Sequence, residues 1–353
     1  MSLTAIDLFS GVGGLSLGFE HVGFKIVIAN EYDKDIAAAY VANHHGVDMI
    51  VGDITTIDLD KVFGNLRGKI DVIVGGPPCQ GFSQKGKRMT ILDERNFLFK
   101  YFCRVVDLVK PRYFVMENVP NLLTAEHGYF REEFTKIFVD MSYNLSMGVL
   151  NAADYGVPQN RRRAVIIGKL EGEAPSLPVP NKEKVTIWDA ISDLAFLNSG
   201  EGAEKQEYRI DAQSSYQKKM RNGSRFLYNH VATKHSAVAL KRLQLIPENF
   251  GKEVLPKNQL TKSIYSGTWT RMRRDESAVT ITTRFDTPAS GKFTHPFLNR
   301  AITVREAARI QSFPDTFIFQ GPKISQMKQV GNAVPPLLAE QIAKVIVDDM
   351  EVH

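Results

Sequence analysis

Residues 71–83 read DVIVGGPPCQGFS, and the rest of the chain is organised around this stretch. A short β-branched run at 71–74 meets two glycines and two prolines, which indicates a strand that ends in a rigid loop. Proline fixes its own φ and donates no backbone hydrogen bond, so the Pro77-Pro78 step holds the sulfur of Cys79 in one place. Ligands of open α/β sheets bind just past such strand ends. The stretch therefore predicts that the thiol of Cys79 is a nucleophile held in position for a ligand. The alternative is that this thiol is small and buried beside a turn.

Length, composition and cysteine count limit the class of protein. The chain has 353 residues, enough for two domains, and an ordinary globular composition. Its only cysteines are Cys79 and Cys103, which excludes a disulfide framework and favours a reducing compartment. The first residues form a strand-like run, and no apolar run approaches the length of a membrane span. We expect a cytoplasmic protein without a membrane partner. The histidines fall at no metal-ligand spacing, so no metal is expected.

Positive charge is concentrated in one segment. The formal net charge is +5, but residues 205–300 contain 18 Lys and Arg against 7 Asp and Glu, a surplus of +11. The rest of the chain carries −6. Clustered Lys and Arg are what neutralisation of phosphates requires, so the segment fits a bound polyanion. The alternative is a solvated basic face without a partner.

The first strand-to-helix turn is rich in glycine. Residues 3–9 read as a buried strand, and the turn Ser10-Gly11-Val12-Gly13-Gly14 leads into a helical pattern at 15–22. Such a turn lets a ligand approach the backbone closely. It is not the dinucleotide fingerprint, because Ser16 stands where the third glycine belongs.

The next two strand ends carry further candidates for a nucleoside-shaped ligand. Glu31 follows an apolar run at the position where such folds grip a ribose diol, although a helix cap is the alternative. Tyr32 could stack on an adenine. Asp53 could accept a hydrogen bond from an adenine amino group, and Ile54 could pack against the ring.

An acidic residue ends the fifth predicted strand. Glu117 closes the apolar run at 113–116 and is therefore partly desolvated, which suits it to hold or give a proton. The alternative is a helix cap or an ion pair. Residues 85–96 are polar and charged, and we expect a loop able to close on a ligand.

Gln159, Arg161 and Arg163 precede an apolar strand at 164–168. On a strand these three side chains share one face, and Arg162 points the other way. Arginines at the start of a buried strand typically bind an anion or a polar ligand. The alternative is that the three arginines form a solvated surface patch.

The predicted fold class is α/β, a doubly wound and mostly parallel sheet with a smaller, irregular strand-and-loop domain. Three prolines between 171 and 184 mark a boundary, and the α/β alternation stops beyond it. We expect the first domain at 1–180 plus 320–353 and the small one at 181–319. Helices are expected at 302–312 and 337–349.

A thiol, an acid, arginines and a nucleoside pocket together fit methyl transfer to cytosine. Addition of the Cys79 thiolate at carbon 6 turns the ring into an enamine whose carbon 5 can attack an electrophilic methyl group. A protonated Glu117 would stabilise the charge that develops toward ring nitrogen 3. Arg163 could bind the ring carbonyl and Arg161 a phosphate or the adduct, with Gln159 placing them. The cytosine must be flipped out of a duplex to reach such a pocket.

Short motifs follow one another in a fixed order: DLFSGVGG at 7–14, Glu31, GD at 52–53, GPPCQGFS at 76–83, ENV at 117–119, Q-x-R-x-R at 159–163, REAARIQSFPD at 305–315 and GNAVP at 331–335. In this order they resemble the bacterial DNA (cytosine-5)-methyltransferases of type II modification systems. The resemblance covers nearly all of the chain outside the basic segment.

The resemblance implies an S-adenosylmethionine-dependent methyltransferase fold that acts on double-stranded DNA. It makes Cys79 the nucleophile, and it places Gln80, Ser83 and Arg95 in a loop facing the DNA. The implied cofactor contacts are Phe9, Gly11, Gly13, Glu31, Tyr32, Asp53, Ile54, Leu98 and Asn332. Family members often have tryptophan where this chain has Tyr32.

The basic segment matches the family's target-recognition domain in position only, so no residue in it can be carried over. The resemblance leaves open whether a cognate restriction endonuclease exists. We expect a monomer.

Three alternatives share parts of this pattern. A tRNA cytosine-5 methyltransferase would have the same Pro-Pro-Cys-Gln stretch, but such proteins look compact where this chain has over a hundred residues between Arg163 and Ile302. A non-catalytic DNA-binding relative should have lost Cys79, Glu117 or the glycine turn. A nicotinamide-dependent dehydrogenase would use neither the thiol nor the acid.

Overall fold

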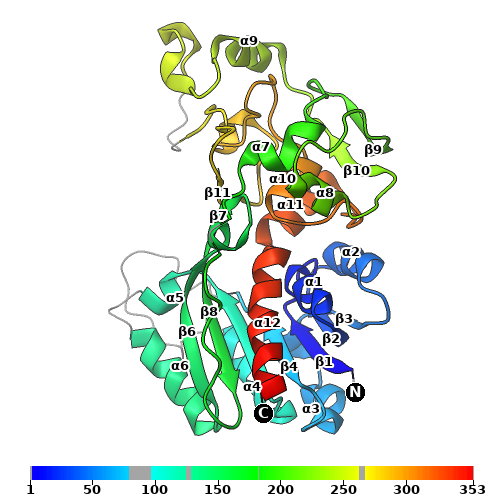
Figure 1. Cartoon of the computed structure of the whole chain (residues 1–353), viewed down its shortest axis with the longest axis vertical. Helices are drawn as coiled ribbons and strands as arrows, with labels where there is room; N and C mark the ends of the chain where they lie inside the picture. Colours follow the sequence, from blue (N-terminus) through cyan, green and yellow to red (C-terminus); the bar gives the residue numbers. More distant parts are fainter. Residues whose placement is uncertain (1, 79–96, 125–128, 182, 262–266, 353) are drawn as a thin grey trace. The chain divides into compact units, whose positions relative to one another are not determined.

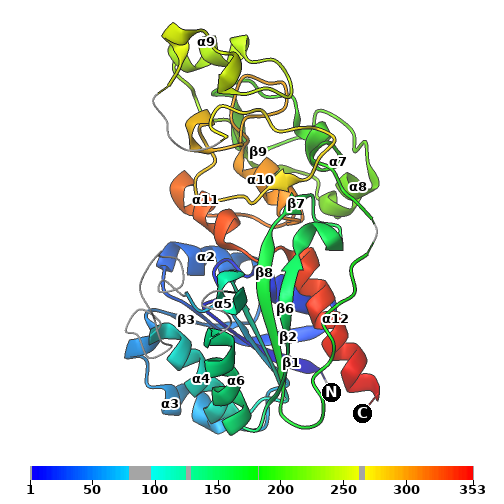
Figure 2. The same ribbon diagram turned by 90° about the vertical axis from the view of Figure 1, so that its left-hand side faces the viewer.

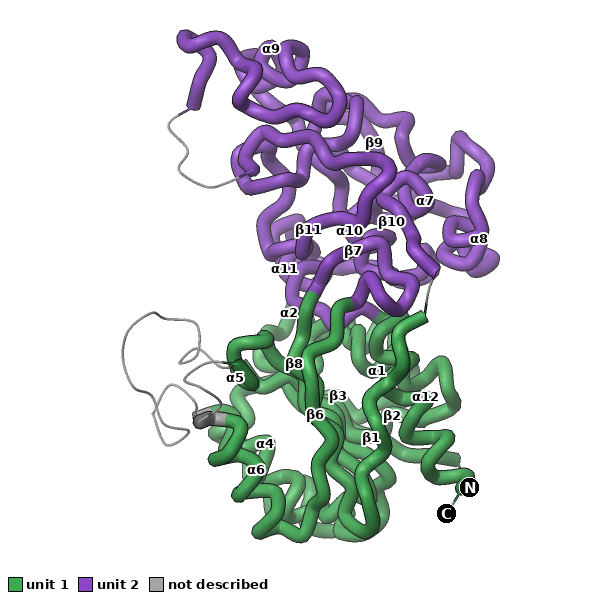
Figure 3. Tube along the Cα trace, turned by 60° about the vertical axis from the view of Figure 1, so that its left-hand side comes forward, with its two compact units in different colours: residues 1–151, 162–181, 336–353 green, residues 152–161, 182–335 purple. Residues whose placement is uncertain are grey.

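The computed structural model (Figure 1) describes residues 2–78, 97–124, 129–181, 183–261 and 267–352. Its contacts divide the chain into two compact units (Figure 3): unit 1 is 1–151, 162–181 and 336–353, and unit 2 is 152–161 and 182–335. The predicted boundary at 180 lies next to the one at 181, but the contacts place residues 152–161, which the prediction puts in the first domain, in unit 2. The other boundary differs, because the contacts place it at 335 and not at 319.

Unit 1 is built on a seven-stranded sheet with the order β3-β2-β1-β4-β5-β8-β6. Its strands are β1 (Leu3–Leu8), β2 (Phe24–Glu31), β3 (Asp48–Val51), β4 (Val72–Gly75), β5 (Tyr113–Asn118), β6 (Asn144–Asn151) and β8 (Arg162–Lys169). Neighbours pair in parallel, except that β8 runs antiparallel to β5 and β6. The strand order reverses between β1 and β4, which puts the ligand crevice of such folds at their carboxyl ends. The predicted doubly wound α/β class is confirmed.

Helices cover both faces of this sheet. They are α1 (Gly14–His21), α2 (Lys34–Asn43), α3 (Leu59–Phe63), α4 (Phe97–Val109), α5 (Asn121–Thr124), α6 (Tyr129–Asp140) and α12 (Pro336–Val352). Figure 2 shows α3, α4 and α6 on one face, where Phe102, Phe114 and Phe138 pack together in the core. On the other face α12 packs against α1, and a Cβ on Gly18 would lie 2.4 Å from that of Ala339. The predicted last helix thus docks on the sheet domain.

Unit 2 combines short helices with two small sheets. Its elements are β7 (Gln159–Asn160), α7 (Ile187–Ile191), β9 (Gly202–Gln206), α8 (Ser215–Arg221), β10 (Leu227–Val231), α9 (Ala237–Leu245), β11 (Ala278–Val279), α10 (Val304–Ile310) and α11 (Lys323–Asn332). β9 pairs antiparallel with β10, and β7 pairs in parallel with β11. Helices contribute more to this unit than its strand-like sequence pattern indicated. Across the described residues of both units, no helix is long and apolar enough to cross a membrane.

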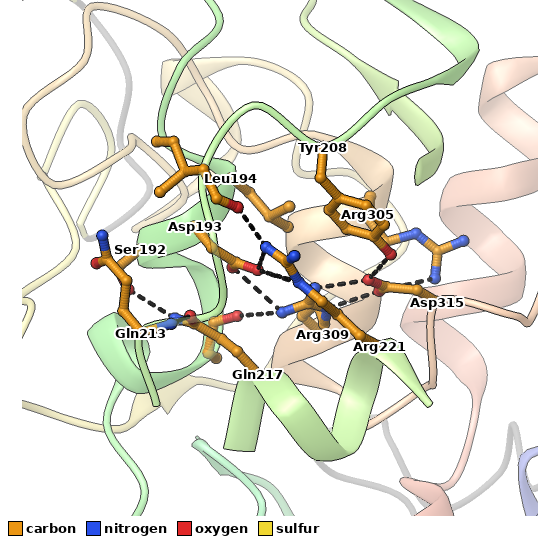
Figure 4. A network of polar contacts seen from close by, with 12 residues as sticks. Ser192, Asp193, Leu194, Tyr208, Gln213, Gln217, Arg221, Arg305, Arg309 and Asp315 are labelled. Atoms are coloured by element: carbon orange, nitrogen blue, oxygen red, sulfur yellow. Dashed lines mark hydrogen bonds and ion pairs between the residues drawn. The ribbon is translucent and has the colours of Figure 1, made fainter. Parts of the chain in front are cut away.

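A buried ionic cluster ties α10 to the rest of unit 2 (Figure 4). Arg309 donates to both oxygens of Asp315 at 2.6 Å and reaches Asp193 at 3.3 Å. Arg221 donates to the same Asp193 at 2.7 Å, and the Tyr208 hydroxyl donates to Asp315 at 2.6 Å. Burial alone would raise the pKa of Asp315, but Arg309, Arg305 and the Tyr208 hydroxyl together outweigh it and lower that pKa. Removing one partner would leave an uncompensated buried charge, so the loss of any one of these residues should destabilise unit 2.

Candidate active site

The carboxyl ends of the parallel strands of unit 1 meet at one edge of the sheet. Leu8 pairs with Asn30 of β2 and with Gly75 of β4, and Glu31 pairs with Val51 of β3. The segments that follow these strands therefore share this edge. They carry most of the predicted cofactor residues: Phe9, Gly11, Gly13, Glu31, Tyr32, Asp53 and Ile54.

The turn after β1 has the backbone that its glycines allow. Gly11 has φ 55° and Gly13 has φ 93°, both in the left-handed region, and Phe9 shares this conformation with φ 56°. A Cβ on Gly13 would lie 2.1 Å from Nε2 of His44, so no side chain fits there. A Cβ on Gly11 would meet no described atom within 4 Å. The turn is therefore closed on one side and open at Gly11.

Glu31 links this turn to the tip of β2. Its Oε2 accepts the backbone N–H of Gly11 and its Oε1 accepts that of Asp33, both at 2.9 Å. Burial raises the pKa of Glu31 against the opposing effect of these two hydrogen bonds. Each carboxylate oxygen has two acceptor positions, so both can still accept from a ligand hydroxyl. Asp33, and not Glu31, caps α2 by accepting from Asp35 and Ile36.

The remaining predicted cofactor residues lie in different surroundings. Tyr32 is 74% exposed. Asp53 caps the short 3-10 helix Ile54–Thr56 by accepting from Thr55 at 2.9 Å. Ile54 belongs to the core cluster, and Leu98 packs against it. Asn332 lies in unit 2.

Asp7 forms a buried polar chain that our sequence reasoning did not single out. Its Oδ2 accepts from the Ser16 hydroxyl at 2.6 Å, and the Ser16 oxygen lies 2.7 Å from the Tyr40 hydroxyl. Its Oδ1 has no hydrogen-bond partner among the described residues. Burial raises the pKa of Asp7 to about 7. The only sequence signal is an acid placed inside an apolar strand.

We expect the wild-type protein to lose stability as pH rises between about 4 and 7, relative to an Asp7→Asn variant. In this window the folded chain retains a proton on Asp7 that the unfolded chain releases, since its pKa rises from 3.8 to about 7 on folding. The loss amounts to at most about 4 kcal/mol. Urea unfolding of both proteins at pH 4.5 and 7.5 measures it. Equal pH dependence in the two proteins would contradict the assignment.

Glu117 and Arg163 form an ion pair at the end of β5. Nε of Arg163 lies 2.7 Å from Oε1 of Glu117, and both side chains are largely buried. A Cβ on Gly76 would lie 3.1 Å from Oε2 of the same carboxyl, so Gly76 and this carboxyl are close neighbours. The Asn118 side-chain amide donates to the carbonyl of Pro77 at 2.8 Å. Glu117 therefore lies against the start of the Gly-Pro-Pro loop that leads to Cys79.

Of the two cysteines, Cys103 lies within the described residues. Cys103 lies in the core of unit 1, and burial raises the pKa of its thiol, which makes it inert. Cys79, Gln80, Ser83 and Arg95 lie outside the described residues.

Gln159 and Arg161 have partners within unit 2. Arg161 is 1% exposed and donates to the carbonyls of Ile281 at 3.1 Å and Gly331 at 2.9 Å. Gln159 accepts from the Ile281 N–H at 2.8 Å. Both are buried while Asn160 and Arg162 are exposed, which is the alternation that a strand predicts. The division into units separates them from Arg163, and their predicted contacts with the base or a phosphate stay predictions.

Comparison with known proteins identifies the family. The model for C-5 cytosine-specific DNA methylases matches residues 3–348. The type II methyltransferase M1.HphI of Haemophilus parahaemolyticus is 40% identical over 350 residues, covering 98% of this chain and 87% of that protein. M.DdeI of Desulfomicrobium norvegicum is 39% identical over 378 residues, with coverages of 98% and 88%.

A solved structure supports the same relationship. A protein described as a DNA modification methyltransferase encoded within an E. coli prophage superposes with a TM-score of 0.80 at 28% identity, covering 99% of this chain and all of the other. The match over nearly the whole length, together with the relatives at 40% and 39% identity, shows that this chain belongs to the C-5 cytosine-specific DNA methylases and is an S-adenosylmethionine-dependent methyltransferase.

Proposed function

We propose that the protein methylates carbon 5 of a flipped-out cytosine within a specific double-stranded DNA sequence, through a covalent bond between Cys79 and carbon 6. The observation that carries the proposal is the Glu117–Arg163 pair, which lies beside the loop leading to Cys79. An acid, a guanidinium and a thiol are the groups that activation of a pyrimidine ring requires.

The proposed reaction begins and ends at the Cys79 sulfur. The Cys79 thiolate forms a bond to carbon 6, and the electron pair of the 5,6 double bond becomes available at carbon 5. Glu117 supplies a proton toward ring nitrogen 3, and Arg163 binds the ring carbonyl. When bound, S-adenosylmethionine would supply an electrophilic methyl group to carbon 5, and its sulfonium sulfur would leave as the neutral thioether of S-adenosylhomocysteine. Loss of the carbon 5 proton, to water in our proposal, then expels the Cys79 sulfur and restores the double bond, and ring nitrogen 3 returns its proton to Glu117.

We assign the cofactor to the edge formed by the ends of β1, β2 and β3. The open side of Gly11 admits a ligand next to the backbone, and the oxygens of Glu31 can accept from ribose hydroxyls. The exposed Tyr32 ring suits stacking on adenine. These features fit S-adenosylmethionine, with Phe9, Gly13, Asp53, Ile54, Leu98 and Asn332 as the further proposed contacts.

We assign target recognition to unit 2. It contains the segment 205–300 with its surplus of +11, which suits contact with DNA phosphates. The names of the relatives place those proteins among type II methyltransferases, so we propose a role in restriction and modification. In this proposal the protein is a cytoplasmic monomer, and Gln80, Ser83 and Arg95 contact the DNA.

Labelled methyl transfer tests the proposed function. The protein is incubated with S-adenosylmethionine carrying a labelled methyl group and either a mixed-sequence duplex DNA or bulk tRNA. We expect label in the DNA at 5-methylcytosine and none in the tRNA. Label in tRNA alone would overturn the substrate assignment and leave the fold and the chemistry of Cys79 intact.

We expect Glu31→Gln to weaken S-adenosylmethionine binding by about 10- to 100-fold, with kcat at saturating cofactor nearly unchanged. The amide nitrogen of glutamine cannot accept a hydrogen bond, so either the Gly11 or the Asp33 N–H loses its partner. Calorimetric titration with the cofactor measures the change. Asp48→Asn, which removes an exposed carboxylate at the amino end of β3, is the control. Equal affinities in the two variants would exclude Glu31 from the cofactor site.

A further inference from the structure

The carboxyl end of α11 is capped by side chains from distant parts of unit 2. Gln311 is fully buried, and its Nε2 donates to the carbonyl of Val330 at 2.7 Å and to that of Ala333 at 3.3 Å. The last carbonyls of a helix have no partner within the helix. Here the amide of Gln311, which follows α10, supplies one.

A second side chain secures the carbonyl between these two. Nη2 of Arg161 donates to the carbonyl of Gly331 at 2.9 Å, while its Nη1 donates to Ile281. A Cβ on Gly331 would lie 2.2 Å from the carbonyl oxygen of Thr282, so the two backbones touch and only glycine fits. The turn at the end of α11 is thus fixed from two sides.

Gln159 links the two side chains, Gln311 and Arg161, that bind the end of α11. Its Nε2 donates to Oε1 of Gln311 at 2.6 Å, and its Oε1 accepts the N–H of Ile281. The amide of Gln311 is therefore oriented by Gln159, and Ile281 is shared with Arg161. The result is one buried hydrogen-bond network that donates to the backbone carbonyls of residues 330, 331 and 333.

The network holds one exposed residue in place. Gly331 and Ala333 are buried, whereas Asn332 between them is exposed. Ala333 leaves the helix with extended backbone angles, φ −61° and ψ 147°. The backbone on both sides of Asn332 is thus held by hydrogen bonds from Gln311 and Arg161.

We propose that Gln311 is a positioning residue for cofactor binding, acting with Gln159 and Arg161 through the backbone at Asn332. This rests on the proposed function, which assigns Asn332 to the cofactor. Gln159 and Arg161, which the sequence placed among the catalytic residues, then also act on the end of α11.

A double-mutant cycle tests the proposal. The dissociation constant of S-adenosylmethionine is measured calorimetrically for wild type, Gln311→Ala, Asn332→Ala and the double variant. We expect each single change to weaken binding by about tenfold and the double variant to bind no more weakly than Asn332→Ala, because coupled residues act non-additively. Gln311→Met, which keeps most of the volume without the amide, replaces Gln311→Ala if the latter does not fold.

The matched control is Gln329→Ala. Gln329 is another buried glutamine of unit 2, and its amide donates to Gln320 at 2.8 Å and to Ser325 at 3.1 Å, not to residues 330–333. A purely structural role would make both glutamine variants less stable and equally able to bind cofactor. We expect cofactor affinity to fall only in the Gln311 variant.

The outcomes distinguish the positioning role of Gln311 from its premise, which is that Asn332 contacts the cofactor. If Asn332→Ala leaves the dissociation constant unchanged, the assignment of Asn332 falls and the inference falls with it. If Asn332→Ala weakens binding but Gln311→Ala behaves like Gln329→Ala, or if the two effects are additive, only the inference is overturned.

Discussion

Cys79→Ser is expected to lose methyl transfer by about 10⁴-fold or more, as removal of a nucleophile does in other enzymes. A serine hydroxyl is far less acidic than a thiol and gives almost no anion near neutral pH, so addition to carbon 6 stops. The residues proposed to contact the cofactor do not include Cys79, so the affinity for S-adenosylmethionine should stay within about twofold of wild type. Single-turnover methyl transfer and calorimetric titration measure the two quantities.

Cys103→Ala is the matched control for this experiment. It removes the other thiol, which is buried in the core of unit 1, and we expect it to retain methyl transfer. If Cys79→Ser lost cofactor binding and activity to the same extent, the defect would be one of folding or cofactor binding, and the role of nucleophile would fail.

Glu117→Gln is expected to lower the rate of methyl transfer by about 10²- to 10⁴-fold. The amide keeps the shape of the side chain and can still accept from Arg163, but it cannot give a proton toward ring nitrogen 3. Because the carboxyl group acts only as the adduct forms, the loss should appear in kcat and leave cofactor affinity unchanged. Single-turnover rates with saturating DNA measure it.

Glu173→Gln removes an exposed carboxylate elsewhere in unit 1 and serves as the control. A loss below about tenfold for Glu117→Gln would reduce Glu117 to a structural partner of Arg163.

The fold of unit 1 follows closely from local sequence signals. Apolar runs stopped by glycine, proline or an acid predict the strands that end at Leu8, Glu31, Gly75 and Asn118. Parallel strands place such stops at one edge, so the candidate cofactor residues of unit 1 can be grouped from the amino-acid sequence alone.

Unit 2 could not be predicted in the same way. Its ionic cluster joins Asp193 and Arg221 to Arg309 and Asp315, and partners so far apart in the chain leave no periodic signal. The run at 279–283 looks like a strand, yet only Ala278–Val279 pairs in a sheet. Packing between distant segments decided these elements.

Residue type alone does not predict which groups Arg161 and Arg163 contact. Arg161 and Arg163 are two positions apart and read alike in the sequence. The structure gives Arg163 an acid as its partner and gives Arg161 two backbone carbonyls. Periodicity predicted which of these side chains turn inward, but the groups that Arg161 meets belong to segments more than a hundred residues away.

Trapping of the covalent adduct tests the central claim most directly. Duplex DNA with 5-fluorocytosine at candidate sites is incubated with the protein and S-adenosylmethionine, then denatured and digested for peptide mapping. Fluorine cannot leave carbon 5 as a proton does, so the sulfur should not be expelled. We predict a complex that survives denaturation, with the DNA attached at Cys79. Methylation of ordinary duplex DNA without any trapped complex, or attachment at another residue, would contradict the account.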